Sequence, residues 1–233
     1  MQPLVKYAKA HALAVIEDSC EAIGAEYQGR NAGTLGDAGV FAFYPNKQMT
    51  TGEGGMICTD LDGWDALCRS LRNQGRAVGD AWLNHTHLGY NYRLDEMSAA
   101  LGLAQLQRLD ALLRKREQVA AWYHTYLSQH ELIETPYVAP TTTRMSWFVY
   151  VVRLRPPLQR DEVVRALAAR GIPSRPYFTP IHLQPFYVER FGYRRGDFPI
   201  TEALGATSLA LPFSGVMSEA EVAYVCDALD DLT

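Results

Sequence analysis

Lys47 is the residue of this chain best placed for covalent chemistry. The sequence has four lysines, and three of them lie in surroundings typical of solvated surfaces: Lys6, Lys9 and Lys115. Lys47 instead follows an almost uncharged predicted strand, residues 39–44, and precedes the glycine-rich run 50–55. A lysine shielded from water can lose its proton and form a Schiff base with a carbonyl compound. A purely structural role for Lys47 is the open alternative.

Asp18 is a second candidate, because it follows the apolar run 12–16. Such a run predicts a buried strand of an α/β sheet, and these sheets bind ligands at the carboxyl ends of their strands. A carboxylate there can keep the ring nitrogen of pyridoxal phosphate protonated, which makes that cofactor an electron sink. Asp18 could equally cap a following helix. Asp18 and Lys47 in one sheet favour the cofactor more than either residue does alone.

Apolar periodicity predicts an α/β region followed by a smaller α+β region. Residues 94–129 have helical spacing, and at 1.5 Å per residue they would reach about 54 Å. We therefore predict one long or broken helix that joins two domains, followed by a linker at 136–143. Further helices are predicted at 4–11, 19–27, 63–72, 160–170 and 218–232, the last with Ser218 as N-cap and Glu221 at the capping-box position. Strands are predicted at 12–16, 39–44, 55–59, 147–154 and from Gly171 to Phe178.

Composition excludes several classes of protein. The 233 residues carry a net charge of −4, with 48% hydrophobic and 21% charged residues. No apolar run approaches the roughly 20 residues that span a bilayer, and the scattered basic residues disfavour nucleic acid as a partner. The four cysteines follow no metal-ligand spacing, and His85 and His87 lack a nearby third ligand, so we predict no metal site and no disulfides. We expect a cytoplasmic protein.

Three ordered motifs make a family resemblance visible. They are residues 15–22 (VIEDSCEA), 41–56 (FAFYPNKQMTTGEGGM) and 89–100 (GYNYRLDEMSAA). They resemble the signatures of the DegT/DnrJ/EryC1/StrS sugar aminotransferases, and the resemblance extends to Leu229. It implies an α/β fold: a partial aspartate-aminotransferase-type large domain (fold type I of pyridoxal phosphate enzymes) with its connecting helix at 1–129, then a small α+β domain at 130–233.

The resemblance also implies roles for individual residues. Lys47 would carry pyridoxal 5'-phosphate as a Schiff base, and Asp18 would pair with the pyridine nitrogen. Glu21, where the family often has Gln or His, would lie against the cofactor ring. Asn91 would reach the phosphate of the neighbouring subunit's cofactor, so we expect a homodimer with shared active sites.

A segment near the C-terminal end of the chain suggests where the substrate binds. Residues 175–187 resemble the family's segment near the sugar nucleotide, particularly in perosamine-synthase-like members. Arg175, Tyr177 and His182 are therefore candidate substrate-binding residues, with core packing as the alternative for His182. The expected reaction is transamination of a nucleotide-linked keto sugar, with glutamate as amino donor, in deoxyaminosugar or polysaccharide biosynthesis.

Two departures from the family pattern lead to an alternative function. Ala42 stands where many members place a serine hydroxyl for the phosphate, and family members are substantially longer, with the difference lying before Met1. The alternative is a truncated, non-catalytic fragment that acts at most as a dimerisation or binding module. On this view the chain exposes apolar surface and binds the cofactor weakly or not at all.

Overall fold

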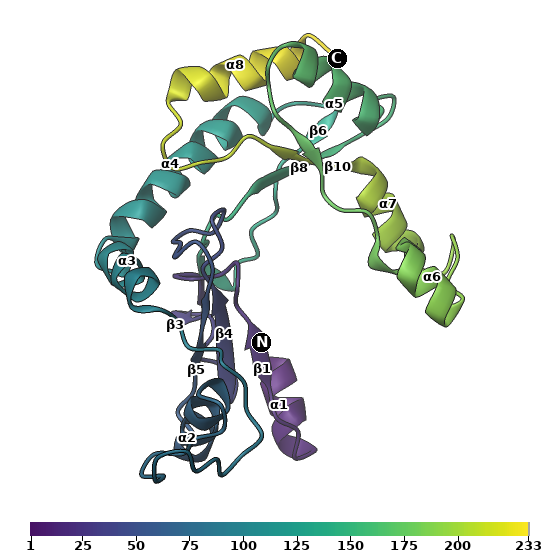
Figure 1. Cartoon of the computed structure of the whole chain (residues 1–233). Coiled ribbons are helices and arrows are strands. Elements are labelled where there is room, and N and C mark those ends of the chain that lie inside the picture. The colour runs from purple at the N-terminus through teal and green to yellow at the C-terminus, as the bar shows by residue number, and fades with distance from the viewer. Residues whose placement is uncertain (233) are drawn as a thin grey trace. The chain divides into compact units, whose positions relative to one another are not determined.

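The computed structural model describes residues 1–232, which form two compact units (Figure 1). The first unit contains residues 1–113 and 139–148, and the second contains 114–138 and the described residues from Val149 on. The segment 139–148 thus returns to the first unit after the chain has entered the second. The predicted domain division at residues 129 and 130 stays a prediction, and each unit is described by itself below.

The first unit is built on a three-stranded sheet in the order β1-β4-β5. β1 and β4 run parallel, with Asp18 opposite Val40, whereas β4 and β5 are antiparallel. Parallel strands end at the same edge of a sheet, so the segments that follow β1 and β4 begin side by side. The strands are β1 (Ile16–Asp18), β4 (Ala38–Ala42) and β5 (Gly55–Cys58), and the nearby helices are α1 (Gln2–Ala10) and α2 (Asp62–Arg72).

Three predictions for this unit are wrong. The first strand lies at Ile16–Asp18 and not at 12–16, because the chain still turns at Ala12, whose φ is 51°. Residues 19–25 form turns instead of a helix, because the chain reverses at Gly24, whose positive φ of 79° favours glycine. The predicted linker contains a strand, since Glu26 of β2 pairs with Arg144 of β7. A second small sheet results, with the strands β3 (Arg30–Asn31), β2 (Glu26–Tyr27) and β7 (Thr142–Arg144).

The helix predicted at residues 94–129 is broken into two helices in the structure. α3 (Glu96–Leu106) and α4 (Leu109–Leu127) are separated by two residues. Asp95 caps α3 by accepting a 2.9 Å hydrogen bond from the backbone N–H of Ser98. The boundary between the two units falls inside α4, after Leu113, so this helix connects them.

The second unit surrounds a four-stranded sheet in the order β6-β8-β10-β9. Its core includes Tyr123, whose hydroxyl donates a 2.7 Å hydrogen bond to the carbonyl of Pro212 and whose ring stacks on Tyr150. The expected capping box of the last helix is confirmed at Ser218 and Glu221. The elements are β6 (Ile133–Glu134), β8 (Tyr150–Leu154), α5 (Arg160–Ala169), β9 (Arg175–Pro176), η1 (Ile181–Leu183), α6 (Pro185–Phe191), α7 (Pro199–Thr207), β10 (Ser208–Leu211) and α8 (Glu219–Asp230).

The first unit exposes apolar side chains on its edge strands, as the sequence predicted. Ile16 of β1 is 65% exposed and Ile57 of β5 is 51% exposed. Both strands lie at edges of the three-stranded sheet, where unpaired backbone groups can pair with another chain. Among the described residues, no helix is both long and apolar enough to cross a membrane.

We predict that the purified 233-residue chain associates through these edges. A lysine at an exposed edge position opposes strand pairing without filling or emptying a core, so Ile16→Lys and Ile57→Lys should each lower the weight-average sedimentation coefficient. Val216→Lys adds the same charge at an 84% exposed position outside any strand and should change nothing. A monodisperse wild-type chain, unaffected by the edge substitutions, would contradict this expectation.

Candidate active site

Lys47 lies where three segments of the first unit meet. Its backbone N–H closes a turn on the carbonyl of Tyr44, directly after β4. The Lys47 side chain is only 13% exposed, and its Nζ is 3.0 Å from Glu21 Oε1. The same Nζ lies 4.4 Å from the centroid of the Phe148 ring. The turn after β1, the loop after β4 and the returning segment 139–148 therefore each contribute one group around the amine.

Gln48 fixes the relative positions of these three segments. Its Nε2 donates to the backbone carbonyl of Glu21 and to Ser146 Oγ, each at 2.7 Å. Ser146 Oγ in turn donates to the carbonyl of Ile23, also at 2.7 Å. Gln48 and Ser146 are both buried, where hydrogen bonds between side chain and backbone restrict movement most. The turn that carries Glu21 is thus tied to the residue next to Lys47.

The glycine-rich loop after Lys47 is anchored to α3. The Gln105 amide accepts from the backbone N–H of Thr50 at 3.1 Å and donates to the carbonyl of Thr50 at 2.8 Å. A Cβ at Gly54, whose φ is 131°, would lie 2.9 Å from the Leu94 side chain. Only glycine accommodates that backbone conformation and approach. The loop therefore has a defined path, and its position is set by α3, the helix in which the third family-like motif ends.

The alternation of β1 separates the roles of its two carboxylates. Glu17 is buried and accepts hydrogen bonds from the backbone N–H groups of Gly33, Leu35 and Gly36 at 3.0, 2.5 and 2.7 Å. Successive strand residues point to opposite faces, so Asp18 faces away from this cradle and is exposed. Glu17 is a structural carboxylate, and Asp18 is the one available to a ligand.

Asp18 is an ionised carboxylate with electrostatic contact to Lys47. Hydrogen bonding from the side chain and backbone of Cys20 lowers the pKa of Asp18, and the positive charge of Lys47 lowers it further. The backbone N–H of Cys20 lies 3.2 Å from Asp18 Oδ1. Burial and the neighbouring Asp18 carboxylate raise the pKa of the Cys20 thiol to about 11, so the thiol is uncharged at neutral pH. The structure thus brings Asp18, Glu21 and Lys47 together.

Asn91 belongs to a different part of the first unit. It forms an isolated antiparallel bridge with Asn73, at the C-terminal end of α2, and is exposed. The loop between them closes through Gly75, where a Cβ would lie 1.7 Å from the carbonyl oxygen of His87. His87 Nδ1 is 2.8 Å from Ser70 Oγ, and His85 Nδ1 is 2.7 Å from the carbonyl of Gln74. Both histidines are therefore engaged in holding the loop.

The candidate substrate-binding residues all lie in the second unit. His182 is buried, and its Nε2 lies 3.0 Å from Glu202 Oε1. Arg175 is exposed on β9 opposite Ala210, and the Tyr177 ring stacks on Phe178. The His182 ring also contacts Phe198, beside a cavity of about 290 Å³. His182 therefore has the partners of a packed residue and also borders a hollow.

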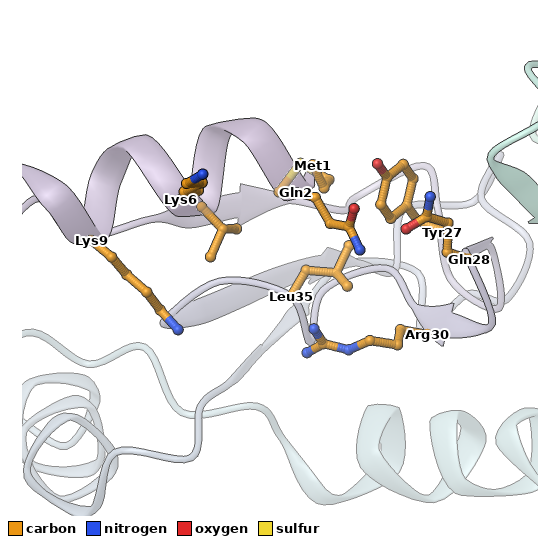
Figure 2. Close-up of a pocket in the computed structure, with 9 residues that line it drawn as sticks. Met1, Gln2, Lys6, Lys9, Tyr27, Gln28, Arg30 and Leu35 are labelled. Atoms are coloured by element: carbon orange, nitrogen blue, oxygen red, sulfur yellow. The ribbon is translucent and has the colours of Figure 1, made fainter.

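A cavity of about 460 Å³ lies beneath α1, away from the reactive residues. Figure 2 shows that Lys6 and Lys9 reach it from α1 and Arg30 from β3. Its full lining is Met1, Gln2, Val5, Lys6, Lys9, Tyr27, Gln28, Arg30 and Leu35. None of the Lys47, Asp18 or Glu21 side chains lines this cavity, so its size is no guide to the reactive site.

Comparison with known proteins decides the family. A sequence model of the DegT/DnrJ/EryC1/StrS aminotransferase family matches residues 1–230. The chain belongs to the DegT/DnrJ/EryC1/StrS aminotransferase family. GDP-perosamine synthase from Caulobacter vibrioides is 42% identical over 235 residues, which cover 100% of this chain and 62% of that protein. Spore coat polysaccharide biosynthesis protein SpsC from Bacillus subtilis is 33% identical and covered to 63%.

The fold of this DegT/DnrJ/EryC1/StrS family member matches solved sugar aminotransferases. DesV of S. venezuelae, solved in complex with a ketimine intermediate, superposes with a TM-score of 0.91 at 32% identity, over 100% of this chain and 61% of that one. The predicted family and fold class are confirmed: the chain is mixed α/β and corresponds to part of a sugar aminotransferase fold. It spans about 62% of the length of the curated relatives it matches.

Sequence reasoning missed the residues that support the site. Gln48, Ser146 and Phe148 position Glu21 and Lys47. A sequence signal was available only for Gln48, which follows Lys47 directly inside the motif 41–56. Ser146 and Phe148 lie about 100 residues further along, so only tertiary structure places them beside Lys47. In the part of the chain that the structure describes, no group of three His, Cys, Asp or Glu residues could hold a metal ion.

We predict a large loss of stability for substitution of one carboxylate of β1 and almost none for the other. Glu17→Gln places an NH2 group against a cradle of N–H donors and should lower the free energy of unfolding by about 2–4 kcal/mol. Asp18 is exposed, so Asp18→Asn should change the free energy of unfolding by less than about 0.5 kcal/mol. Urea unfolding followed by circular dichroism measures both. Equal destabilisation by the two substitutions would show that Asp18 is part of the structural cradle.

Proposed function

We propose that this protein catalyses the pyridoxal phosphate-dependent transamination of a keto nucleotide sugar, with glutamate as amino donor. The proposal depends chiefly on one observation: Lys47 pairs with Glu21 in the segments that follow β4 and β1, and its charge lowers the pKa of Asp18, the last residue of β1. An amine and two carboxylates at this edge suit a cofactor that needs a covalent anchor and a partner for its ring nitrogen. Membership of an aminotransferase family gives the reaction class.

The residues present fit the reactive end of pyridoxal phosphate. When bound, this cofactor supplies an electron sink for a carbanion next to an amino group. Asp18 suits the protonated ring nitrogen, because its lowered pKa keeps it charged at neutral pH. Lys47 offers the primary amine, and Glu21 lies beside it. The hydroxyl of Thr50 donates to the carbonyl of Phe43, and position 42 is alanine. The family resemblance implies that Asn91 of a second subunit contacts the phosphate.

Lys47 is proposed to move protons during the reaction. Its Nζ would take a proton from the α-carbon of the amino donor and return it, acting first as general base and then as general acid. Phe148 and Glu21 orient this atom, and the network around Gln48 keeps them in register. Asp18 would hold the proton of the ring nitrogen throughout. Proximity of this kind is effective only when the groups are held in place beforehand.

The substrate class is proposed from the relatives. Two of the most similar ones are GDP-perosamine synthases, 42% and 34% identical to this chain. Arg175, Tyr177 and His182 are proposed to contact the sugar nucleotide from the second unit. The placement of Asn91 away from Lys47's immediate partners is consistent with a homodimer in which it serves the other subunit.

We predict that Lys47 is the residue that binds the cofactor covalently. Borohydride reduction in the presence of pyridoxal phosphate should fix the cofactor to Lys47, as read by peptide mass spectrometry. Lys47→Arg keeps the charge but cannot form the link, so it should abolish both the adduct and turnover. The matched controls are Lys6→Arg, Lys9→Arg and Lys115→Arg, which should leave the adduct in place. Fixation only at those three lysines would refute the assignment.

We predict that Asp18 acts on chemistry and not on folding. Asp18→Asn removes the charge that keeps the ring nitrogen protonated, so turnover should fall by about two orders of magnitude or more while some covalent cofactor remains at Lys47. The measurements are the initial rate of amino transfer and the borohydride adduct on the same preparation. Unchanged turnover would show that Asp18 acts only as a hydrogen-bond acceptor for Cys20.

A dimerisation or binding module is the second candidate, and the exposed edges of β1 and β5 favour it. The two functions differ in one spectrum. An enzyme titrated with pyridoxal phosphate develops a stoichiometric Schiff-base absorption band at about 420 nm, whereas a binding module does not. The same titration is repeated on this chain after co-expression with the part of the Caulobacter relative that lies outside the match.

A further inference from the structure

Two groups that favour an ammonium lie against the Lys47 side chain. Glu21 Oε1 lies 3.0 Å from Nζ, and the face of Phe148 lies 4.4 Å away. A carboxylate and an aromatic face both stabilise an ammonium group and give little to a neutral amine. Attack on a carbonyl, however, requires the neutral amine. The arrangement around Lys47 therefore opposes the first covalent step of the proposed chemistry until one of these contacts changes.

Glu21 is the contact that can change. Its side chain is 49% exposed, while that of Lys47 is 13% exposed. The backbone of Glu21 is fixed, because its carbonyl accepts the 2.7 Å hydrogen bond from buried Gln48. Rotation of the Glu21 side chain alone into solvent thus breaks the ion pair and leaves the main chain in place. Phe148 carries no charge that water could stabilise if its side chain moved. Asp18 accepts a hydrogen bond from the backbone N–H of Cys20.

We propose that Glu21 is a reversible lock on Lys47, a positioning residue that holds the ammonium until a carbonyl compound arrives and then turns into solvent. The inference deepens the proposed function and rests on it. In the covalent step, one proton passes from Lys47 Nζ to water. A carbon–nitrogen double bond forms, the carbon–oxygen double bond breaks, and the oxygen leaves as water with the other two nitrogen-bound hydrogens. No oxidant or reductant is needed.

The lock also gives a reason for glutamate at this position. A neutral glutamine has the same shape and can hydrogen-bond the amine, but it stabilises the ammonium less strongly. With glutamate, the amine is less reactive toward adventitious aldehydes.

The test compares the reactivity of single lysines in the ligand-free chain. A limiting amount of acetic anhydride labels amines, and mass spectrometry gives the rate at Lys47 relative to Lys6, Lys9 and Lys115 in the same molecules. Glu21→Gln should raise the relative rate at Lys47 by about fivefold, the size expected when a charge-assisted contact to a half-exposed carboxylate is lost. Glu21→Asp, which keeps the charge on a shorter side chain, should give an intermediate rate.

Glu96→Gln is the matched control. It removes one negative charge from an exposed position at the start of α3 and should leave the relative rate at Lys47 unchanged. Equal labelling of Lys6, Lys9 and Lys115 in every variant shows that the fold is retained. An unchanged rate at Lys47 in Glu21→Gln, or an equal increase in Glu96→Gln, would overturn the lock.

A second measurement separates the lock from the proposed function. With pyridoxal phosphate as the probe, the rate of adduct formation at Lys47, trapped by borohydride at timed intervals, should be faster in Glu21→Gln than in the wild-type chain. If no adduct forms in any variant while acetylation changes as expected, the lock stands and the cofactor assignment fails. If adducts form at the same rate in both chains and acetylation is unchanged, the cofactor assignment stands and the lock fails.

Discussion

The parallel pairing of β1 with β4 is the constraint on which the site depends. It joins Asp18 to Val40 in register and places the two strand ends at one edge of the sheet. The turn that carries Glu21 and the loop that carries Lys47 leave from that edge. An antiparallel pairing would send them in opposite directions, and no adjustment of side chains would bring a carboxylate to the Lys47 amine. The chemistry of this chain therefore begins with strand direction.

Hydrogen bonds between buried groups fix the positions of β1 and of the segments that carry Glu21 and Lys47. Glu17 accepts three backbone N–H groups of the 33–36 turn and so secures β1 from its buried face. Gln48 and Ser146 secure the opposite side, where Glu21 and Lys47 lie. Buried polar groups of this kind are costly to leave unpaired, which makes alternative positions of the two turns unfavourable. The exposed carboxylates of Asp18 and Glu21 are thus supported by buried residues.

The return of the segment 139–148 to the first unit has a functional consequence. It brings Phe148 against the Lys47 amine and Ser146 against Gln48, after the chain has already contributed to the second unit. The next residue, Val149, belongs to that second unit. The site is thus adjacent in sequence to the connection between the units. The pairing of β7 with β2 holds the returning segment in the first unit.

The sequence by itself determined the family and the fold class, and it predicts Asp18, Glu21 and Lys47 as the reactive residues, because these three lie within short contiguous motifs. It also determined the cap of α8, since a capping box needs only four neighbouring residues. Tertiary structure alone decided that residues 19–25 turn instead of forming a helix and that residues 142–144 form a strand. Local propensity is overridden there by pairing with distant strands. Gln48, Ser146 and Phe148 acquired their roles in the same way, because contacts across about 100 residues depend on how the chain folds back and leave no local pattern.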